Sequence, residues 1–136
     1  MKQSEKDYKR IVVKIGSSLL YSDKKILDYN FVENIIAQIT TLIRCGVEVI
    51  LVSSGAIAGG MYVLKFNSRP KDLSSLQALA AVGQHFLMSQ YRSFFTRKKL
   101  ECAQILLTWE DFDSRKRYLN AKNTILTLLK LGSIPI

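Results

Sequence analysis

Hydrophobic residues along the chain fall into short unbroken runs and longer stretches with helical spacing. Residues 10–15 (RIVVKI) and 47–52 (VEVILV) are short runs rich in β-branched residues, which is typical of buried strands. Between them, from Asn30 to Cys45, apolar residues recur every three or four positions. This spacing predicts an amphipathic helix with Asn30 as its N-cap and Gly46 as its C-terminal stop. Strand, helix and strand in this order predict a right-handed crossover between parallel strands.

The same alternation continues to the last residues of the sequence. The stretch 74–77 (SSLQ) has the spacing of a capping box and predicts a helix that reaches about Phe95. Residues 102–107 predict a third strand, residues 114–131 a further helix, and residues 133–136 the start of a fourth strand. The order predicts an α/β fold, a three-layer sandwich with a mostly parallel sheet, truncated after about the fourth strand.

Length and composition set the outer limits of the prediction. A chain of 136 residues is enough for about one domain. We therefore expect an N-terminal tail at residues 1–9 and a domain at residues 10–136. No apolar stretch reaches the roughly 18–20 residues of a membrane span, and the charged N-terminus is unlike a signal peptide. Cys45 and Cys102 lack metal-ligand spacing and are expected to be reduced core residues, which predicts a cytoplasmic protein without a membrane partner.

The net charge of +9 has two interpretations. Basic clusters at residues 97–99 (RKK) and 115–117 (RKR) could attract the phosphates of a nucleic acid. The favoured interpretation is a solvated surface that also attracts small anionic substrates. Neither cluster carries the interleaved aromatic residues of a base-stacking surface, so nucleic acid is not the expected partner.

Two strand ends carry the residues that could perform chemistry. The sequence KIGSS (14–18) follows the first predicted strand, and SSGA (53–56) follows the second. In open parallel sheets, ligands bind beyond the carboxyl ends of the strands. Glycine lets the backbone approach a ligand, small hydroxyls donate hydrogen bonds, and the N-terminus of the following helix attracts anions. Each loop therefore suits a carboxylate or a phosphate, although neither has a Walker A or G-x-G-x-x-G pattern.

Lys14 has two interpretations on local features alone. Its ammonium could stabilise the charge on a phosphoryl group during transfer. It could also be an edge-strand lysine whose apolar stem carries the charge to water.

The remaining polar and aromatic candidates predict structural roles. His85, the only histidine, is expected to be a packed or surface residue, and Trp109 a packing residue. Asp111 and Asp113 are expected to cap the following helix rather than bind a metal. Gly83, inside a predicted helix, is expected to allow close packing against a neighbour, because glycine costs a helix about 1 kcal/mol relative to alanine.

Five stretches carry a family resemblance, in order and over nearly the whole chain from residue 10. They are IVVKIGSSLL (11–20), VILVSSGAIAGG (49–60), LQALAAVGQ (76–84), QILLTWEDF (104–112) and RYLNAKNTI (117–125). The first resembles the amino acid kinase family as a whole. SSGAIAGG, ALAAVGQ and RYLNA together resemble the glutamate 5-kinase branch, rather than the aspartate, acetylglutamate, carbamate or UMP kinases.

The resemblance implies ATP-dependent phosphorylation of the γ-carboxylate of L-glutamate, the first step of proline biosynthesis, with Mg²⁺ on the nucleotide phosphates. It assigns Lys14 as the catalytic, phosphate-contacting lysine. It implies a phosphate-side loop of Gly16, Ser17 and Ser18. It implies that Ser54 holds glutamate, in a pocket shaped by Ser53, Gly55 and Ala56. It assigns no metal ligand in this chain and is compatible with a homo-oligomer.

The family continues beyond the strand that begins at Ile134. An Asn-Glu-Asn-Asp segment that contacts glutamate follows there, and then the half of the domain that grips the nucleotide. The resemblance therefore implies that this chain is the N-terminal, glutamate-binding part of the kinase domain and is inactive alone. The alternatives are an inactive remnant that serves as an interaction module, another amino acid kinase, and a basic nucleic-acid-binding protein.

Overall fold

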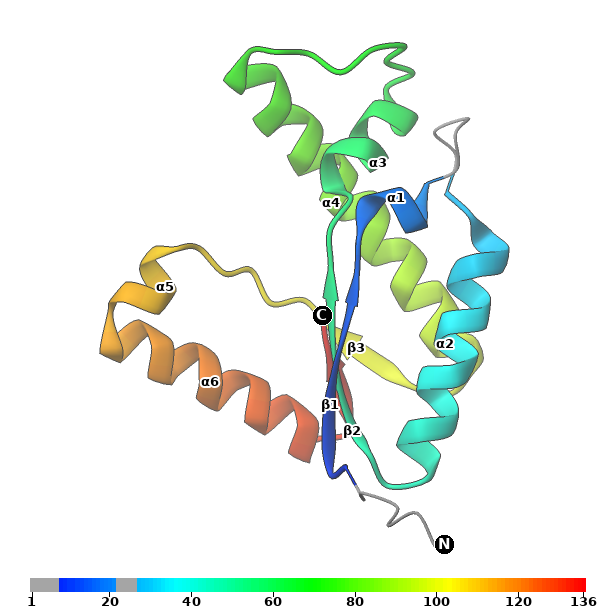
Figure 1. Ribbon diagram of the computed structural model, residues 1–136, viewed down its shortest axis with the longest axis vertical. Coiled ribbons are helices and arrows are strands. Elements are labelled where there is room, and N and C mark those ends of the chain that lie inside the picture. Colours follow the sequence, from blue (N-terminus) through cyan, green and yellow to red (C-terminus); the bar gives the residue numbers. More distant parts are fainter. Residues whose placement is uncertain (1–7, 22–26) are drawn as a thin grey trace, which may run out of the picture.

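The computed structural model of the protein describes residues 8–21 and 27–136 (Figure 1). Its strands are β1 (Arg10–Ile15), β2 (Glu48–Ser53), β3 (Glu101–Ala103) and β4 (Ser133–Pro135). β1 pairs in parallel with β2, and β3 pairs in parallel with β4. The described strands form two separate two-stranded sheets, and β2 lies beside β4 without a hydrogen-bonded ladder between them. The predicted parallel pairing is confirmed, although the described strands form two small sheets rather than one continuous sheet.

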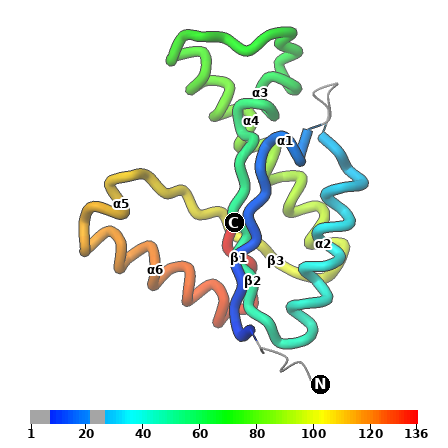
Figure 2. The backbone as a smooth tube through the Cα atoms, viewed as in Figure 1, coloured from blue at the N-terminus to red at the C-terminus, as the bar shows by residue number. Residues whose placement is uncertain are grey.

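Helices cover both faces of these strands. α2 and α4 lie on one face and α6 lies on the other, which confirms the three-layer prediction (Figure 1). α3 and the first half of α4 project beyond the ends of β1 and β2 (Figure 2). The helices are α1 (Ser17–Leu20), α2 (Tyr29–Arg44), α3 (Ala56–Val63), α4 (Leu73–Arg97), α5 (Glu110–Asp113) and α6 (Arg115–Lys130).

The hydrophobic core lies between the strands and the α2–α4 layer. Alternate residues of β1 and β2 face this core, since side chains alternate between the two faces of a strand. On the opposite face Val12 and Val52 are 62% and 47% exposed, so the α6 side of β1 and β2 is open. The largest fully buried side chains belong to the core: Leu20, Ile36, Ile39, Leu51, Tyr91 and Phe95.

Two predicted N-caps are wrong by two residues. α2 is capped by Asp28, whose carboxylate accepts a hydrogen bond from the Phe31 N–H at 2.9 Å. α4 is capped in the same way by Asp72. In both helices the aspartate precedes the predicted cap and provides a charged acceptor for the free N–H groups of the first turn. The predicted stop of α2 at Gly46 is confirmed, with φ of 83°.

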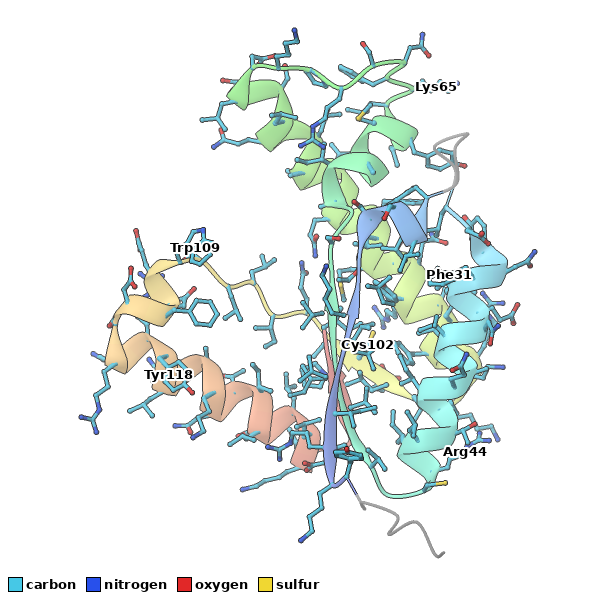
Figure 3. All side chains as sticks on the ribbon, in the orientation of Figure 1. Phe31, Arg44, Lys65, Cys102, Trp109 and Tyr118 are labelled. Carbon is cyan, nitrogen blue, oxygen red and sulfur yellow. The ribbon has the colours of Figure 1, made fainter. Side chains whose placement is uncertain are left out.

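The predicted third strand is also wrong at its end. Glu101–Ala103 pairs with β4, and the Ile105 N–H makes one further bond to the Ile136 carbonyl at 2.8 Å. The chain then turns away from the strands, so that Leu106 is 72% exposed. Trp109 is 87% exposed and stands at the outer end of α5, away from the strands (Figure 3), so its prediction as a packing residue is wrong. Cys45 caps the C-terminus of α2 and is exposed rather than in the core, whereas Cys102 is partly buried.

Asp111 does not cap the next long helix. Its carboxylate accepts hydrogen bonds from the Thr108 N–H at 2.6 Å and the Thr108 hydroxyl at 3.0 Å, and it pairs with Arg117 at 2.9 Å. These bonds, the one from the Thr108 backbone first, lower the pKa of Asp111. The cap of α6 is Ser114, which accepts from the Arg117 N–H.

The predicted N-terminal tail cannot be compared with the structure, because its first seven residues lie outside the described residues. The division of the chain at residue 10 stays a prediction. Within the described part of the chain, no helix combines the length and the apolar character that crossing a membrane requires.

Candidate active site

The two loops singled out from the sequence meet at one edge of the β1–β2 pair. Lys14 lies opposite Val52 in the parallel register. The Ser54 N–H donates to the Ile15 carbonyl at 3.1 Å, which ties the two strand ends together. Lys14 and Ser54 are therefore at the same end of the strands, as the sequence predicts. The Lys14 side chain is exposed on the open face, beside Val52.

The loop after β1 leaves its backbone accessible. Gly16 has φ of −78°, so its conformation does not require glycine. A Cβ at this position would meet only the Ser18 Oγ, at 3.9 Å, so the missing side chain leaves open space beside the backbone. Ser17 and Ser18 are exposed, and no described residue hydrogen-bonds to either hydroxyl. An anion can therefore approach this loop and find free hydroxyl donors.

The two serines at the end of β2 have internal hydrogen bonds that the sequence did not reveal. The Ser53 hydroxyl lies 2.8 Å from the Tyr91 hydroxyl, and burial raises the pKa of the Tyr91 phenol. The Ser54 hydroxyl donates to the Ile15 carbonyl at 3.3 Å, a long and weak bond. Ser53 is therefore fixed against α4, whereas Ser54 can turn its proton toward a ligand at little cost.

Gly55 lets the chain turn directly from β2 into α3. Its φ of 112° lies in the left-handed region, and a Cβ there would be 2.9 Å from the Tyr21 ring. The first bond inside α3 runs from the Gly59 N–H to the Gly55 carbonyl, and no described side chain caps the helix. The N–H groups of the first turn, including that of Ala56, are therefore available to an anion beside Ser54.

α3 and α4 cross with their backbones in direct contact. A Cβ on Gly83 would lie 2.8 Å from the Ala56 carbonyl carbon, and one on Gly60 would lie 2.7 Å from the Leu79 carbonyl carbon. Both distances are too short for a Cβ to occupy either position. The prediction that Gly83 allows close packing is confirmed. The crossing fixes the N-terminus of α3, so the glycines of SSGAIAGG and ALAAVGQ position the loop that contains Ser54.

Tyr21 is a buried residue beneath this loop, and sequence analysis missed it. Its ring packs under Gly55, and its hydroxyl lies next to Gly59, where a Cβ would be 2.7 Å away. The hydroxyl is buried without a hydrogen-bond partner among the described residues. Burial raises the pKa of Tyr21 to about 12, and the nearby phenols of Tyr91 and Tyr29 add to the rise.

Replacing Tyr21 by phenylalanine is expected to stabilise the protein by about 1 kcal/mol at pH 7, because an unpaired buried hydroxyl costs ~1–3 kcal/mol. The unfolded chain releases the Tyr21 proton near pH 10 and the folded chain near pH 12. The free energy of unfolding of the wild type should therefore fall as the pH rises from 10 to 12, whereas below pH 10 the ionisation of Tyr21 does not change it. Urea unfolding at pH 7 and pH 11 measures both effects. Tyr91→Phe is the matched control and should destabilise, since it removes the 2.8 Å hydrogen bond between the Tyr91 and Ser53 hydroxyls.

A cavity of about 340 Å³ opens where β2 and β4 end. Residues of β2, α4, the segment after β3 and α6 line it. Its polar side chains come from Ser53 and Gln84, and its remaining lining side chains are apolar. A second cavity of about 250 Å³ lies between β2 and the α5–α6 region, beside Tyr118 (Figure 3).

The basic clusters are partly engaged by their own neighbours. Arg117 pairs with Glu110 at 2.8 Å as well as with Asp111, and Arg97 lies over the Phe94 ring, 4.6 Å from its centre. His85 is exposed, which confirms a surface histidine. Among the described residues, no group of three His, Cys, Asp or Glu side chains could hold a metal ion.

Comparison with known proteins places these features in a family context. The sequence profile of the amino acid kinase family matches residues 9–136. A protein named glutamate 5-kinase from Burkholderia vietnamiensis is 54% identical over 130 residues, and one of the same name from Cupriavidus taiwanensis is 55% identical over 128 residues. The alignments cover 96% and 94% of this chain but 35% and 34% of the relatives. The chain thus spans about a third of the length of these curated relatives.

Proposed function

Because the chain belongs to the amino acid kinase family, we propose that the protein transfers the γ-phosphoryl group of ATP to the γ-carboxylate of L-glutamate. The observation that carries this proposal is the identity of 54–55% with two relatives named glutamate 5-kinase. The position of Lys14 and Ser54 at one edge of the strands supports it. The product is γ-glutamyl phosphate, and its formation begins proline biosynthesis. A cytoplasmic location and a homo-oligomer are part of the same proposal.

We assign the phosphate side of the reaction to the loop after β1. A γ-carboxylate oxygen attacks the γ-phosphorus, a new O–P bond forms, and the bond to the β–γ bridging oxygen breaks to release ADP. Lys14 is the catalytic residue, because its exposed ammonium can neutralise the charge on the migrating phosphoryl group. Gly16, Ser17 and Ser18 offer open backbone and free hydroxyls to the phosphates. We propose that Mg²⁺ arrives bound to the ATP phosphates.

We assign the glutamate side to the loop after β2. Ser54 can donate its hydroxyl proton to a carboxylate once the 3.3 Å bond to Ile15 is released. Gly55 and Ala56 contribute the N–H groups of the first turn of α3, where the helix dipole favours an anion. Ser53 supports the loop through Tyr91.

The direct test is formation of γ-glutamyl hydroxamate by the purified protein, as its gene encodes it, with glutamate, ATP, Mg²⁺ and hydroxylamine. ADP release that depends on glutamate supports the proposal. ADP release with aspartate, acetylglutamate or carbamate in place of glutamate would identify a different amino acid kinase. No ADP release with any of these acceptors would favour the inactive remnant.

Replacing Ser54 by alanine is expected to raise the KM for glutamate at least tenfold and to change kcat little. The variant loses the hydrogen bond from the Ser54 hydroxyl to the glutamate carboxylate, which is worth about 1.5–3 kcal/mol. Because this bond already exists in the bound ground state, its loss affects KM rather than kcat. Steady-state kinetics in both substrates measures the split, with the exposed Ser93→Ala as the control. An unchanged KM for glutamate with a raised KM for ATP would show that the two loops have the opposite roles.

A further inference from the structure

The cavity at the ends of β2 and β4 contains a polar side chain that the proposed function leaves unused. Gln84 lines this cavity from α4, together with apolar residues such as Met88 and Leu106. It is half-buried, and no described residue hydrogen-bonds to its carboxamide. This free carboxamide therefore offers both a donor and an acceptor to a ligand that enters the cavity.

The packing of α4 fixes where Gln84 stands. Tyr91, two helical turns further along α4, is hydrogen-bonded to Ser53 at the end of β2. Gly83, the residue before Gln84, packs against the Ala56 carbonyl in the first turn of α3. Gln84 is therefore held between the end of β2 and the N-terminus of α3.

The other polar side chain of the cavity is already committed. The Ser53 hydroxyl bonds to Tyr91 at 2.8 Å and to the Ser54 carbonyl at 3.1 Å. Among the described residues that line the cavity, Gln84 is thus the one whose donors and acceptor are free. Its amide NH₂ can donate to a carboxylate and its amide oxygen can accept from an ammonium. This pair of functions complements the zwitterionic head of an α-amino acid.

We propose that Gln84 binds the α-ammonium and α-carboxylate of the substrate glutamate, a role that rests on the proposed function and extends it. Lys14 and Val52 project from one face of the strands and Ser53 from the other, and the cavity reaches both faces at its β2 edge. An amino acid held by its head at Gln84 therefore directs its side-chain carboxylate toward the Lys14 side. Gln84 selects for an amino acid over a simple dicarboxylate.

The test compares binding of L-glutamate and of glutarate, which lacks the ammonium, to the wild type, to Gln84→Leu and to the control Gln77→Leu. Gln77 is an exposed amide on the same helix, outside the cavity. Calorimetric titration of the protein as its gene encodes it gives both dissociation constants. In Gln84→Leu, we expect the constant for glutamate to rise at least tenfold and that for glutarate to rise by a smaller factor, because glutarate loses the contact to its carboxylate but has no ammonium contact to lose. Gln77→Leu should match the wild type.

Steady-state kinetics provides the second readout. We expect Gln84→Leu to raise the KM for glutamate, with kcat and the KM for ATP nearly unchanged. Equal loss of glutamate and glutarate binding, or a joint rise of both KM values with a lower melting temperature, would show a structural role and overturn the proposal. Unaltered binding in Gln84→Leu, or a wild type that binds no glutamate, would also overturn it. A wild type that binds glutamate through Gln84 but releases no ADP would refute the proposed kinase function and leave this inference standing.

Discussion

Replacing Lys14 by alanine is expected to lower kcat by about 10²–10³-fold, with a much smaller change in the KM for glutamate. Lys14 lies at the end of β1, in register with Val52 and next to Ile15, whose carbonyl receives the Ser54 N–H. A cation in this position interacts most strongly with the extra negative charge of the transition state. Removal of one such preorganised contact costs about 2.7–4 kcal/mol in activation free energy.

The two interpretations of Lys14 can be separated by mutation, because the side chain is exposed. An exposed lysine with no structural partner among the described residues can be replaced at little cost in stability, so the folded variant can be assayed directly. Lys9, next to the opposite end of β1, is the matched control, and Lys9→Ala should keep its kcat. Rapid-quench or coupled ADP assays at saturating glutamate and ATP measure the difference. A Lys14→Ala variant with normal kcat would show that Lys14 is a solvent-exposed edge lysine without a catalytic role.

The sequence pattern predicted the elements of the fold and their direction, because periodicity depends only on neighbouring residues. β1, α2 and β2 lie where the hydrophobic spacing places them. The predicted helix starts were wrong where two residues near the start could act as the N-cap. In α2, for example, Asp28 rather than Asn30 accepts a hydrogen bond from the first turn. The segment after Ala103 is apolar enough for a strand, but it turns away from the strands toward α5. This path depends on tertiary packing, which the local sequence pattern does not encode.

The candidate site divides in the same way. Lys14 and Ser54 could be placed together from the sequence, since the carboxyl ends of parallel strands meet at one edge. Tyr21, Tyr91 and Gln84 could not. Tyr91 reaches Ser53 across 38 positions of sequence, and Tyr21, the C-cap residue of α1, packs under Gly55. Tertiary packing brings these residues to the site, and their spacing along the sequence does not predict it.

The crossing of α3 and α4 leads to the largest expected effect on stability. Replacing Gly83 by alanine is expected to destabilise the protein by at least about 3 kcal/mol, although alanine is the better helix former by ~1 kcal/mol. The added Cβ would meet backbone atoms of Ala56 and Gly60, which cannot rotate away as a side chain can. The two helices must therefore separate, and the N-terminus of α3 must move away from Ser54.

Gly132→Ala is the informative control for this prediction. Gly132 has φ of 75°, and no described atom lies within 4 Å of the position that an added methyl group would occupy, so alanine there meets only backbone strain of about 1–2 kcal/mol. Urea unfolding should rank Gly83→Ala well below Gly132→Ala in free energy of unfolding, and only Gly83→Ala should also raise the KM for glutamate. Equal stability of the two variants would mean that α3 and α4 do not touch through their backbones. A stable Gly83→Ala protein with intact glutamate binding would show that the α3–α4 crossing does not position the Ser54 loop.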